Sequence, residues 1–530
     1  MPFPLHHVTQ GALIEMLAQE RPDHEALVYP DGGLRWTFKD LDRRSLALSR
    51  GLCAVGVAPG DHVTVWSDNR PDWIALQLAL ARIGAVLVTA NVGLTEPEIG
   101  YLLKQSKSRF AIVAPGRKDT EYLDALAGLR SDPATLPELR EVVSIDGPAR
   151  DGVLSLEELV RAGEATPESD VYGRCRETTV DHPANIQYTS GTTGFPKGVV
   201  LTHGNLIENA WAGAQANGAV ASDRVMLMVP LFHCFGCVVV LLGAYTHGLP
   251  LIAVQNFDPP KVLEAIAAER ATILDGVPAM FLALLNHPDL LEHDLSSLRA
   301  GIVAGSMCPE PLMRRIHDEM GIDGIAAAYG LTEASPGVTI SPVDAPLEQR
   351  LTTCGPPFPN VELRIVDPET LADRPAGERG EVLVKGPNVM LGYHDDPEAT
   401  ARAITPDGWL RTGDLGIVDR DGALVIKGRI KELVIRGGEN VFPGEVEDAL
   451  RTHPQVVDAA VFGVPDDRLG EEVAAAVIVE PGVRLTPDEL VRWLESRLAS
   501  YKRPRHWTFL ATFPMTASGK VQKFKLVDLL

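Results

Sequence analysis

Short apolar runs alternate with helical patterns over roughly the first 330 residues, and this rhythm restricts the fold more than any other feature of the chain. One series of strand-like runs lies between residues 63 and 114, and a second lies between residues 225 and 329. Helical stretches separate the runs, which favours parallel strands joined by right-handed crossovers. The pattern predicts an α/β fold whose large N-terminal part contains two doubly wound sheets.

The pattern changes between about residues 350 and 427, where short strands and turn residues predict a small β-rich subdomain. Asp421-Gly422 separates two of these strands and predicts a hairpin turn. Beyond residue 432 the sequence predicts an α+β unit that ends in a strand over Trp507–Leu510 and a loop tail. We therefore expect an N-terminal domain over residues 1–428, a hinge over residues 429–431 and a C-terminal domain over residues 432–530.

Acidic residues outnumber basic ones by 71 to 49, so the chain carries a formal net charge of −22. A field of that sign repels nucleic acid and anionic membranes, so any anionic ligand needs a local site. The longest nearly apolar run, Cys234–Tyr245, is far shorter than the ~20 residues that a membrane-spanning helix requires. The N-terminus has no basic start, and the six cysteines form no disulfide framework. We expect a cytoplasmic protein without a membrane span.

The segment Tyr188-Thr-Ser-Gly-Thr-Thr-Gly-Phe-Pro-Lys-Gly198 carries the strongest chemical signal in the sequence. Its glycines allow a ligand to approach the backbone closely, and its hydroxyl groups and lysine suit a polyphosphate. A P-loop is excluded because Pro196, which has no N–H, precedes the lysine and Gly198 follows it. The residues predicted to bind phosphate are Thr189, Ser190, Gly191, Thr192, Thr193, Gly194 and Lys197.

Four further motifs follow along the chain. They are Tyr329-Gly-Leu-Thr-Glu333, Thr412-Gly-Asp414, Gly428-Arg-Ile-Lys-Glu432 and Pro514-Met-Thr-Ala-Ser-Gly-Lys520. Together with the glycine-rich loop, and in this order, they resemble the adenylate-forming superfamily of acyl-CoA synthetases, adenylation domains and firefly-type luciferases. The resemblance covers nearly the whole chain. It implies that ATP and a carboxylic acid form an acyl-adenylate and pyrophosphate, and that the acyl group then passes to coenzyme A with release of AMP.

The resemblance also implies a role for each motif residue. A carboxylate that attacks the α-phosphate brings two anions together, so the reaction needs cations and a metal. By resemblance, Glu333 and Thr189 hold Mg²⁺, and Lys520 is the catalytic cation that bridges the carboxylate and the phosphates. The other implied residues are Gly305, Tyr329, Gly330, Leu331 and Thr332 at the adenine end, Asp414 and Arg429 at the ribose or phosphate, Lys431 as the hinge of a mobile C-terminal domain, and Arg436, Gly437 and Gly438 at coenzyme A.

The prediction of an acyl-binding segment depends on Pro230-Leu-Phe-His-Cys-Phe-Gly236. It resembles the segment that lines the acyl entrance in the superfamily, and the resemblance makes His233 a catalytic candidate. Amino-acid activators carry Phe-Asp at the comparable place, whereas His233-Cys234 stands here, so an α-amino acid is disfavoured. We expect a medium-chain fatty acid or another apolar acid as the substrate. Loading of a carrier protein in trans, a bulky or aryl acid, and a non-catalytic binding relative are the alternatives. A homodimer is a family-level expectation.

Overall fold

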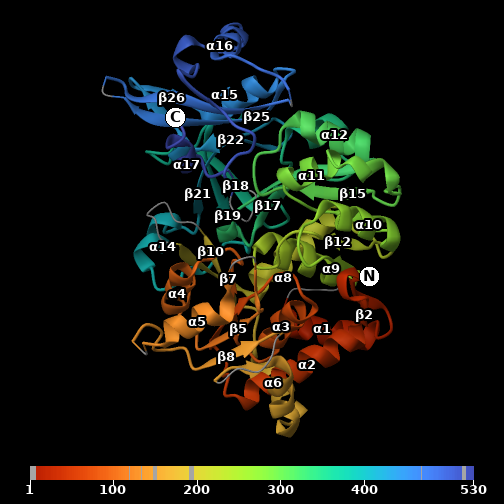
Figure 1. The fold of residues 1–530 in the computed structure, drawn as a ribbon. Coiled ribbons are helices and arrows are strands. Elements are labelled where there is room, and N and C mark those ends of the chain that lie inside the picture. Colours follow the sequence, from red (N-terminus) through yellow and green to blue (C-terminus); the bar gives the residue numbers. More distant parts are fainter. Residues whose placement is uncertain are drawn as a thin grey trace.

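A computed structural model describes residues 7–117, 120–132, 134–146, 152–189, 196–466, 468–480, 482–515 and 521–530. The prediction of two large sheets in the N-terminal part is confirmed, because the two largest sheets each contain eight strands. Helices flank both sheets, and the small C-terminal unit lies at one end of the molecule (Figure 1). Side chains of both large sheets, such as Val63 and Met226, belong to one hydrophobic cluster, so the two sheets share a core.

The first large sheet takes most of its strands from the second series of apolar runs. Its inner strands are parallel, and an antiparallel strand closes each edge. The N-terminal pair β1–β2 was not anticipated in this sheet, because its partner strands lie about two hundred residues further along the chain. The strand order is β17 (Gly337–Ile340), β16 (Gly324–Gly330), β15 (Ala300–Val303), β14 (Ile273–Leu274), β12 (Val225–Leu227), β13 (Leu251–Ala253), β1 (Glu25–Tyr29) and β2 (Leu34–Thr37).

The second large sheet contains the strands of the first series together with the two strands that flank the glycine-rich segment. Its β4 (Val86–Ala90) is buried at every position, as expected of a parallel strand that is covered on both faces. The two strands at its β20 edge are antiparallel to their neighbours. The strand order is β20 (Gly392–Tyr393), β11 (Lys197–Thr202), β10 (Pro183–Thr189), β4, β3 (His62–Trp66), β5 (Phe110–Val113), β8 (Glu141–Ser144) and β9 (Leu154–Ser155).

Some of the helices between these strands begin at a residue whose side chain caps the helix. Thr37 closes a capping box with Asp40 at the start of α2 (Phe38–Ala54), and the Thr37 hydroxyl accepts the Asp40 N–H at 3.2 Å. The other helices that matter for the site are α8 (His203–Ala216), the π-helix η3 (Phe235–Val240), α9 (Leu241–Thr246) and α12 (Glu310–Met320). No helix within the described ranges is long and apolar enough to cross a membrane.

Two smaller sheets follow. The first is antiparallel, and its β21–β22 pair is the hairpin predicted around Asp421-Gly422. The chain changes sheet between Arg429 and Val434, close to the predicted hinge. The first sheet has the order β18 (Glu362–Val366), β19 (Gly380–Lys385), β21 (Leu410–Val418) and β22 (Leu424–Arg429), and the second contains β24 (Glu439–Val441), β23 (Val434–Arg436), β26 (Gly470–Val479), β25 (Val456–Asp466) and β27 (His506–Phe509).

The C-terminal unit packs α15 (Pro443–Arg451) and α16 (Pro487–Glu495) against its sheet, and this apolar cluster is separate from the core of the large sheets. It touches the rest of the molecule where the Arg379 guanidinium lies 3.4 Å from the centre of the Phe442 ring. The predicted loop tail is wrong in part, because Lys523–Val527 forms the short helix α17, which buries Leu526 in a small apolar cluster. A five-residue helix with one buried side chain leaves too little periodicity to be recognised from sequence.

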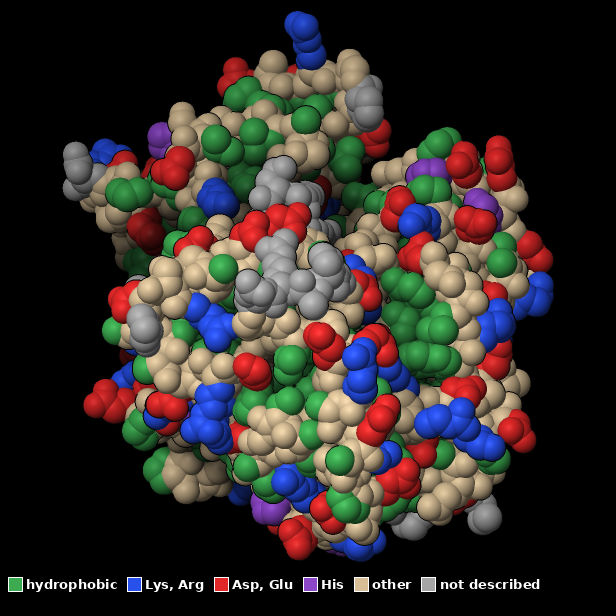
Figure 2. All heavy atoms as spheres, turned by 60° about the horizontal axis from the view of Figure 1, so that its bottom comes forward, with side chains coloured by type: hydrophobic (Ala, Val, Ile, Leu, Met, Phe, Trp, Pro, Cys, Tyr) green, Lys and Arg blue, Asp and Glu red, His purple; other side chains and the backbone are tan. Residues whose placement is uncertain are grey.

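Acidic and basic side chains are interspersed over the face shown in Figure 2, so the negative net charge of the chain does not make that face uniformly acidic. The local charge of a site therefore decides which anion it accepts.

Candidate nucleotide and acyl site

Three of the predicted residues meet where two sheets approach each other. Tyr329 lies near the end of β16, Asp414 lies within β21, and Arg429 ends β22 directly opposite Asp414 in the strand register. The Tyr329 Oη donates to the Asp414 Oδ2 at 2.7 Å, and the Arg429 Nε lies 2.9 Å from the Asp414 Oδ1. The carboxylate is almost fully buried, yet each of its oxygens has a partner. The predicted grouping of Tyr329, Asp414 and Arg429 is present in the folded chain.

The charge states of this trio follow from its burial. Burial raises the pKa of the Tyr329 hydroxyl well above its usual value, and the negative charge of Asp414 raises it further. Tyr329 therefore stays protonated and remains a donor. The Asp414 carboxylate also raises the pKa of Arg429, so its guanidinium stays charged. Each Asp414 oxygen keeps a second lone pair, which is the acceptor capacity that a vicinal diol needs.

A second carboxylate, which sequence reasoning missed, holds the turn in front of Asp414. Glu381 of β19 is 1% exposed and pairs with the Arg411 guanidinium at 2.6 Å. Its other oxygen accepts the Gly413 N–H at 3.2 Å, and the Thr412 hydroxyl accepts the Asp414 N–H at 3.0 Å. These two hydrogen bonds therefore hold the backbone of the Thr412-Gly-Asp414 turn in place. The one hint in the sequence is that Arg411 stands immediately before the motif.

The predicted metal carboxylate lies on the phosphate side of the trio. Glu333 belongs to the short 3-10 helix Thr332–Ala334, and its Oε1 accepts the Tyr393 Oη–H at 2.9 Å. The Lys197 Nζ lies 5.1 Å from the centre of the Tyr393 ring, and Lys197 faces Thr189 in the β10–β11 register. Thr189, Lys197 and Glu333 are thus brought together around Tyr393, a residue that sequence reasoning did not identify.

These residues fit Mg²⁺ bound together with a nucleotide. Among the described residues, no three His, Cys, Asp or Glu side chains gather into a group that could hold a metal. Mg²⁺ keeps several waters and is commonly held by one or two carboxylates plus substrate phosphates. The half-buried Glu333 carboxylate is the protein ligand that such a site requires, and Lys197 is a cation that suits the phosphates.

The other predicted nucleotide residues lie at the carboxyl ends of neighbouring parallel strands, where open α/β sheets bind ligands. Gly305 is exposed just beyond β15, and Gly330 is exposed at the end of β16. A Cβ at Gly330 would lie 2.2 Å from the Pro336 carbonyl oxygen, so only glycine fits there. Leu331 and Thr332 are half-buried, and the Leu331 N–H donates to the same Pro336 oxygen at 2.9 Å.

The predicted acyl segment lies beside this edge. The Cys234 Sγ lies 3.7 Å from the Thr332 Oγ1, next to Glu333, and the His233 Nδ1 accepts the Phe235 N–H at 3.2 Å. The apolar π-helix η3 starts here and runs into the core. A Cβ at Gly236 would lie 2.2 Å from the Pro230 carbonyl oxygen, so glycine is what allows the segment to fold back on itself.

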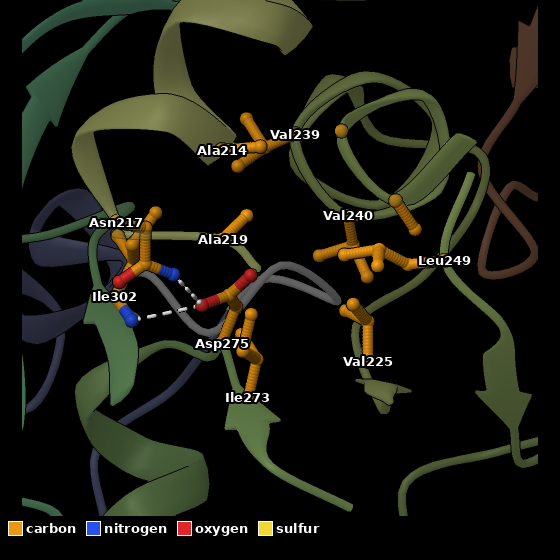
Figure 3. Close-up of a pocket in the computed structure, with 12 residues that line it drawn as sticks. Ala214, Asn217, Ala219, Val225, Val239, Val240, Leu249, Ile273, Asp275 and Ile302 are labelled. Carbon is orange, nitrogen blue, oxygen red and sulfur yellow. Dashed lines mark hydrogen bonds between the residues drawn. The ribbon is translucent and has the colours of Figure 1, made fainter. Parts of the chain in front are cut away.

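A cavity of about 20 Å³, enough for one water molecule, lies between η3, α8 and the strands that lead toward Gly305 (Figure 3). Its polar side chains are Asn217 and Asp275, and the rest of its lining is apolar. The Asp275 Oδ1 accepts the Ile302 N–H at 2.8 Å and the Asn217 amide at 3.4 Å (Figure 3). Burial raises the pKa of Asp275 to about 7. Through the Ile302 N–H, the Asp275 carboxyl group holds β15, the strand that leads to the predicted nucleotide residue Gly305.

The coenzyme A residues are placed differently. Arg436 is committed to a bidentate ion pair with the buried Glu472, in which the Arg436 Nη2 donates to the Glu472 Oε2 at 2.8 Å. Gly437 and Gly438 are exposed in the turn that follows. Lys431 is exposed in the 3-10 helix Ile430–Glu432. Partial burial lowers the pKa of Lys431, and the positive charges of Lys197 and Arg429 lower it further.

Six predicted residues lie outside the part of the chain that the structure describes. Their places in the sequence are bracketed by described elements, since Thr189 ends β10 and Lys197 begins β11. Met515, within the Pro514–Lys520 motif, forms an antiparallel bridge with Val521, which directly follows the motif. The six are Ser190, Gly191, Thr192, Thr193, Gly194 and Lys520, and their roles stay predictions.

Comparisons with known proteins identify the family of the chain. Residues 14–394 match the AMP-binding enzyme family, and residues 445–520 match the AMP-binding enzyme C-terminal domain. The chain is 42% identical to YngI of Bacillus subtilis (strain 168), named as a candidate acyl-CoA synthetase, over 98% of this chain and 97% of that protein. It is 36% identical to the mitochondrial medium-chain acyl-CoA ligase ACSF2 of Bos taurus, over 98% of this chain and 87% of that protein.

A solved structure is similar over the whole chain. The anthranilate CoA ligase AuaEII in complex with anthranoyl-AMP superposes with a TM-score of 0.87 at 28% identity, over 99% of this chain and 97% of that one. That structure holds anthranoyl-AMP, an acyl-adenylate of the kind that the resemblance implies for this chain.

Proposed function

The chain belongs to the AMP-binding enzyme family and is an AMP-forming acyl-CoA ligase, and we propose that its substrate is an apolar, medium-chain carboxylic acid. ATP and coenzyme A are the co-substrates, and Mg²⁺ is the metal that the reaction uses. The observation that carries the nucleotide part of this function is the pairing of Tyr329 and Arg429 with Asp414. The apolar π-helix η3 beside Cys234 carries the substrate part. The alternative of a non-catalytic relative is disfavoured, because Arg429 pairs with Asp414 and because Glu333 and Lys197 share Tyr393 as a partner.

The geometry assigns the first half-reaction to this edge. A carboxylate oxygen of the acid attacks the α-phosphorus of ATP, a new P–O bond forms, and the bond to pyrophosphate breaks. Asp414 and Tyr329 hold the nucleoside, and the Lys197 ammonium faces the departing phosphates. Glu333 and Thr189 would hold Mg²⁺, which neutralises phosphate charge. Lys520 is proposed as the cation between the two reacting anions.

The second half-reaction needs a thiol at the acyl carbon of the adenylate. The sulfur of coenzyme A adds to that carbon, the thiol proton is lost, and AMP leaves as the C–O bond to its phosphate breaks. We propose that a domain of residues 432–530 rotates about a hinge at 429–431 between the halves, against the domain of residues 1–428. The change of sheet between Arg429 and Val434 supports this division. Rotation about Lys431 would bring Gly437 and Gly438 to the site.

The substrate class follows from what surrounds the acyl segment. The π-helix beside Cys234 carries only apolar side chains, so a chain that lies along it gains about 0.8 kcal/mol for each buried CH₂. A free α-ammonium would instead face the Cys234 thiol, which is a poor partner for a cation. His233 is half-buried at the same place and is proposed to contact the reacting carboxylate. The medium-chain relative of Bos taurus supports the same class.

Two further expectations concern the surroundings of the enzyme. None of the six cysteines forms a disulfide bond, as is usual for proteins of a reducing compartment such as the cytoplasm. A homodimer stays a prediction.

The proposal is tested by acid-dependent pyrophosphate release, followed by analysis of the thioester. With coenzyme A saturating, kcat/KM for octanoate should exceed that for norleucine by more than about a thousandfold, because burial of methylenes and exclusion of the ammonium act in the same direction. An amino acid within tenfold of octanoate would contradict the proposed substrate class.

The same assay separates the acceptors and the acids. Replacing coenzyme A by a holo-carrier protein should leave pyrophosphate release intact and abolish thioester formation. A thioester formed only on the carrier would make the enzyme a carrier-loading one. Preference for benzoate or anthranilate over octanoate would establish the aryl alternative.

A further inference from the structure

One aromatic side chain joins the carboxylate and the lysine of the phosphate side. Tyr393 ends β20, whose antiparallel pairing with β11 sets Tyr393 opposite Val199, two residues beyond Lys197. Its neighbours fasten the same segment on both sides, since the His394 N–H donates to the Gly198 carbonyl at 2.7 Å and the Met390 N–H donates to the Glu333 carbonyl at 2.9 Å. The backbone around Tyr393 is therefore tied to both partners of its side chain.

The Tyr393 side chain makes a different contact with each partner. Its hydroxyl donates to the Glu333 Oε1 at 2.9 Å, and the Lys197 ammonium lies 5.1 Å from the centre of its ring. The donor occupies one lone pair of Glu333 and leaves the others for a cation.

Both contacts matter for chemistry on a nucleotide triphosphate. Mg²⁺ requires nearly ideal octahedral geometry, so the direction in which a ligating carboxylate points affects metal affinity, and groups that hold a ligand in place change affinity markedly. A lysine is a flexible point charge, and the face of an aromatic ring restricts where its ammonium lies.

We propose that Tyr393 is a positioning residue with two separable roles: its hydroxyl orients Glu333 toward Mg²⁺, and its ring holds the Lys197 ammonium toward the nucleotide phosphates. The inference rests on the proposed function, because it assumes that Glu333 and Lys197 serve Mg²⁺ and ATP. It adds to that function a residue that acts through two others.

Two substitutions separate the roles. Tyr393→Phe removes only the hydroxyl, so the Mg²⁺ concentration for half-maximal pyrophosphate release should rise about tenfold. The KM for ATP at saturating Mg²⁺ should stay within about twofold, because the ring remains. Tyr393→Leu also removes the ring, so it should raise the KM for ATP as well. The matched control is Tyr122→Phe, which removes a buried hydroxyl that donates to the Val92 carbonyl at 2.7 Å, and it should change neither quantity.

Double variants distinguish positioning from a general loss of stability. In a Glu333→Gln background, Tyr393→Phe should cause no further change in Mg²⁺ dependence, because the hydroxyl acts only through that carboxylate. In a Lys197→Gln background, the phenylalanine and leucine variants should have the same KM for ATP. Additive effects in either background, or equal Mg²⁺ dependence of Tyr393→Phe and Tyr122→Phe, would overturn the inference.

Failure of the proposed function would look different. Absence of acid-dependent pyrophosphate release in the unmodified enzyme would contradict the function itself. Calorimetric titration of the same variants with ATP at several Mg²⁺ concentrations measures both roles without turnover. Unchanged Mg²⁺ dependence of ATP binding in Tyr393→Phe would then refute the positioning role alone.

Discussion

The proposed adenosine end of the site and the proposed coenzyme A end differ in how far the folded chain has assembled them. At the first, Tyr329, Asp414 and Arg429 already touch, and a buried Glu381 fixes the turn behind Asp414. At the second, Arg436 is bound to Glu472, and Gly437 is exposed. Tyr329 and Asp414 lie on two sheets that pack against each other in the folded chain, whereas Arg436 lies on the sheet of the C-terminal unit, for which we propose a rotation.

The comparison predicts that variants on the two sides damage different half-reactions. Residues of the adenosine end and its catalytic cation should affect pyrophosphate release. Residues near Arg436 should affect only the transfer to coenzyme A. The measurements below start with the largest expected effect.

The largest effect is expected for Lys520→Ala. Loss of one preorganised cation should lower the rate of pyrophosphate release by on the order of 10²–10³-fold. Thioester formation from a supplied acyl-adenylate should be unchanged, because this step no longer brings a carboxylate and a phosphate, two anions, together. The matched control is Lys525→Ala, an exposed lysine of the same C-terminal segment, which should leave both rates unchanged. Equal loss in both half-reactions would contradict the division of labour.

An intermediate effect is expected at the coenzyme A end. Arg436→Gln should raise the KM for coenzyme A about tenfold without slowing pyrophosphate release, because a charge-assisted contact with a phosphate is lost. The single variant also leaves the buried Glu472 without its cation. The informative pair is therefore Arg436→Gln/Glu472→Gln against Glu472→Gln alone. If both have a normal KM for coenzyme A, Arg436 is structural and the predicted coenzyme A contact is wrong.

The smallest effect concerns stability beneath the adenosine end. Asp275 has a pKa raised to about 7 by burial, above its ordinary value of 3.8, so the folded chain binds its proton more tightly than the unfolded chain does. The free energy of unfolding therefore falls as pH rises from about 4 to 7, and above pH 7 the whole destabilisation by the ionised Asp275 carboxylate is present. Asp275→Asn keeps an acceptor for the Ile302 N–H and cannot ionise.

The variant should therefore melt at a higher temperature than the parent at pH 8, by on the order of 5 °C, with little difference at pH 4.5. Differential scanning calorimetry across this range measures the gap. A gap that is constant with pH would mean that Asp275 is not the group that titrates. The KM for ATP of the variant tells whether the support of the Gly305 strand also matters for binding.

Several features were determined by the sequence alone. The alternation of apolar runs and helical patterns predicts most strands of both large sheets. Periodicity is a local property of the sequence, so a strand can be recognised before the strands that pair with it are known. The Asp421-Gly422 hairpin and the capping box at Thr37 were predictable for the same reason. The ordered motifs identified the family, and with it Tyr329, Asp414, Arg429, Glu333 and Lys197.

Other features were decided only by the tertiary structure. The loop expected after residue 510 contains α17, whose Lys523 binds Glu432 at 2.9 Å, about ninety residues away in the chain. Strands β1 and β2 join a sheet that is built far downstream. Tyr393 lies 60 residues from Glu333, and the two meet because β20 pairs with β11 at the edge of a sheet. The local sequence pattern indicates which face of an element is apolar. Packing across the whole core decides which elements touch each other, and the contacts of Tyr393, the proposed positioning residue, arise from that packing.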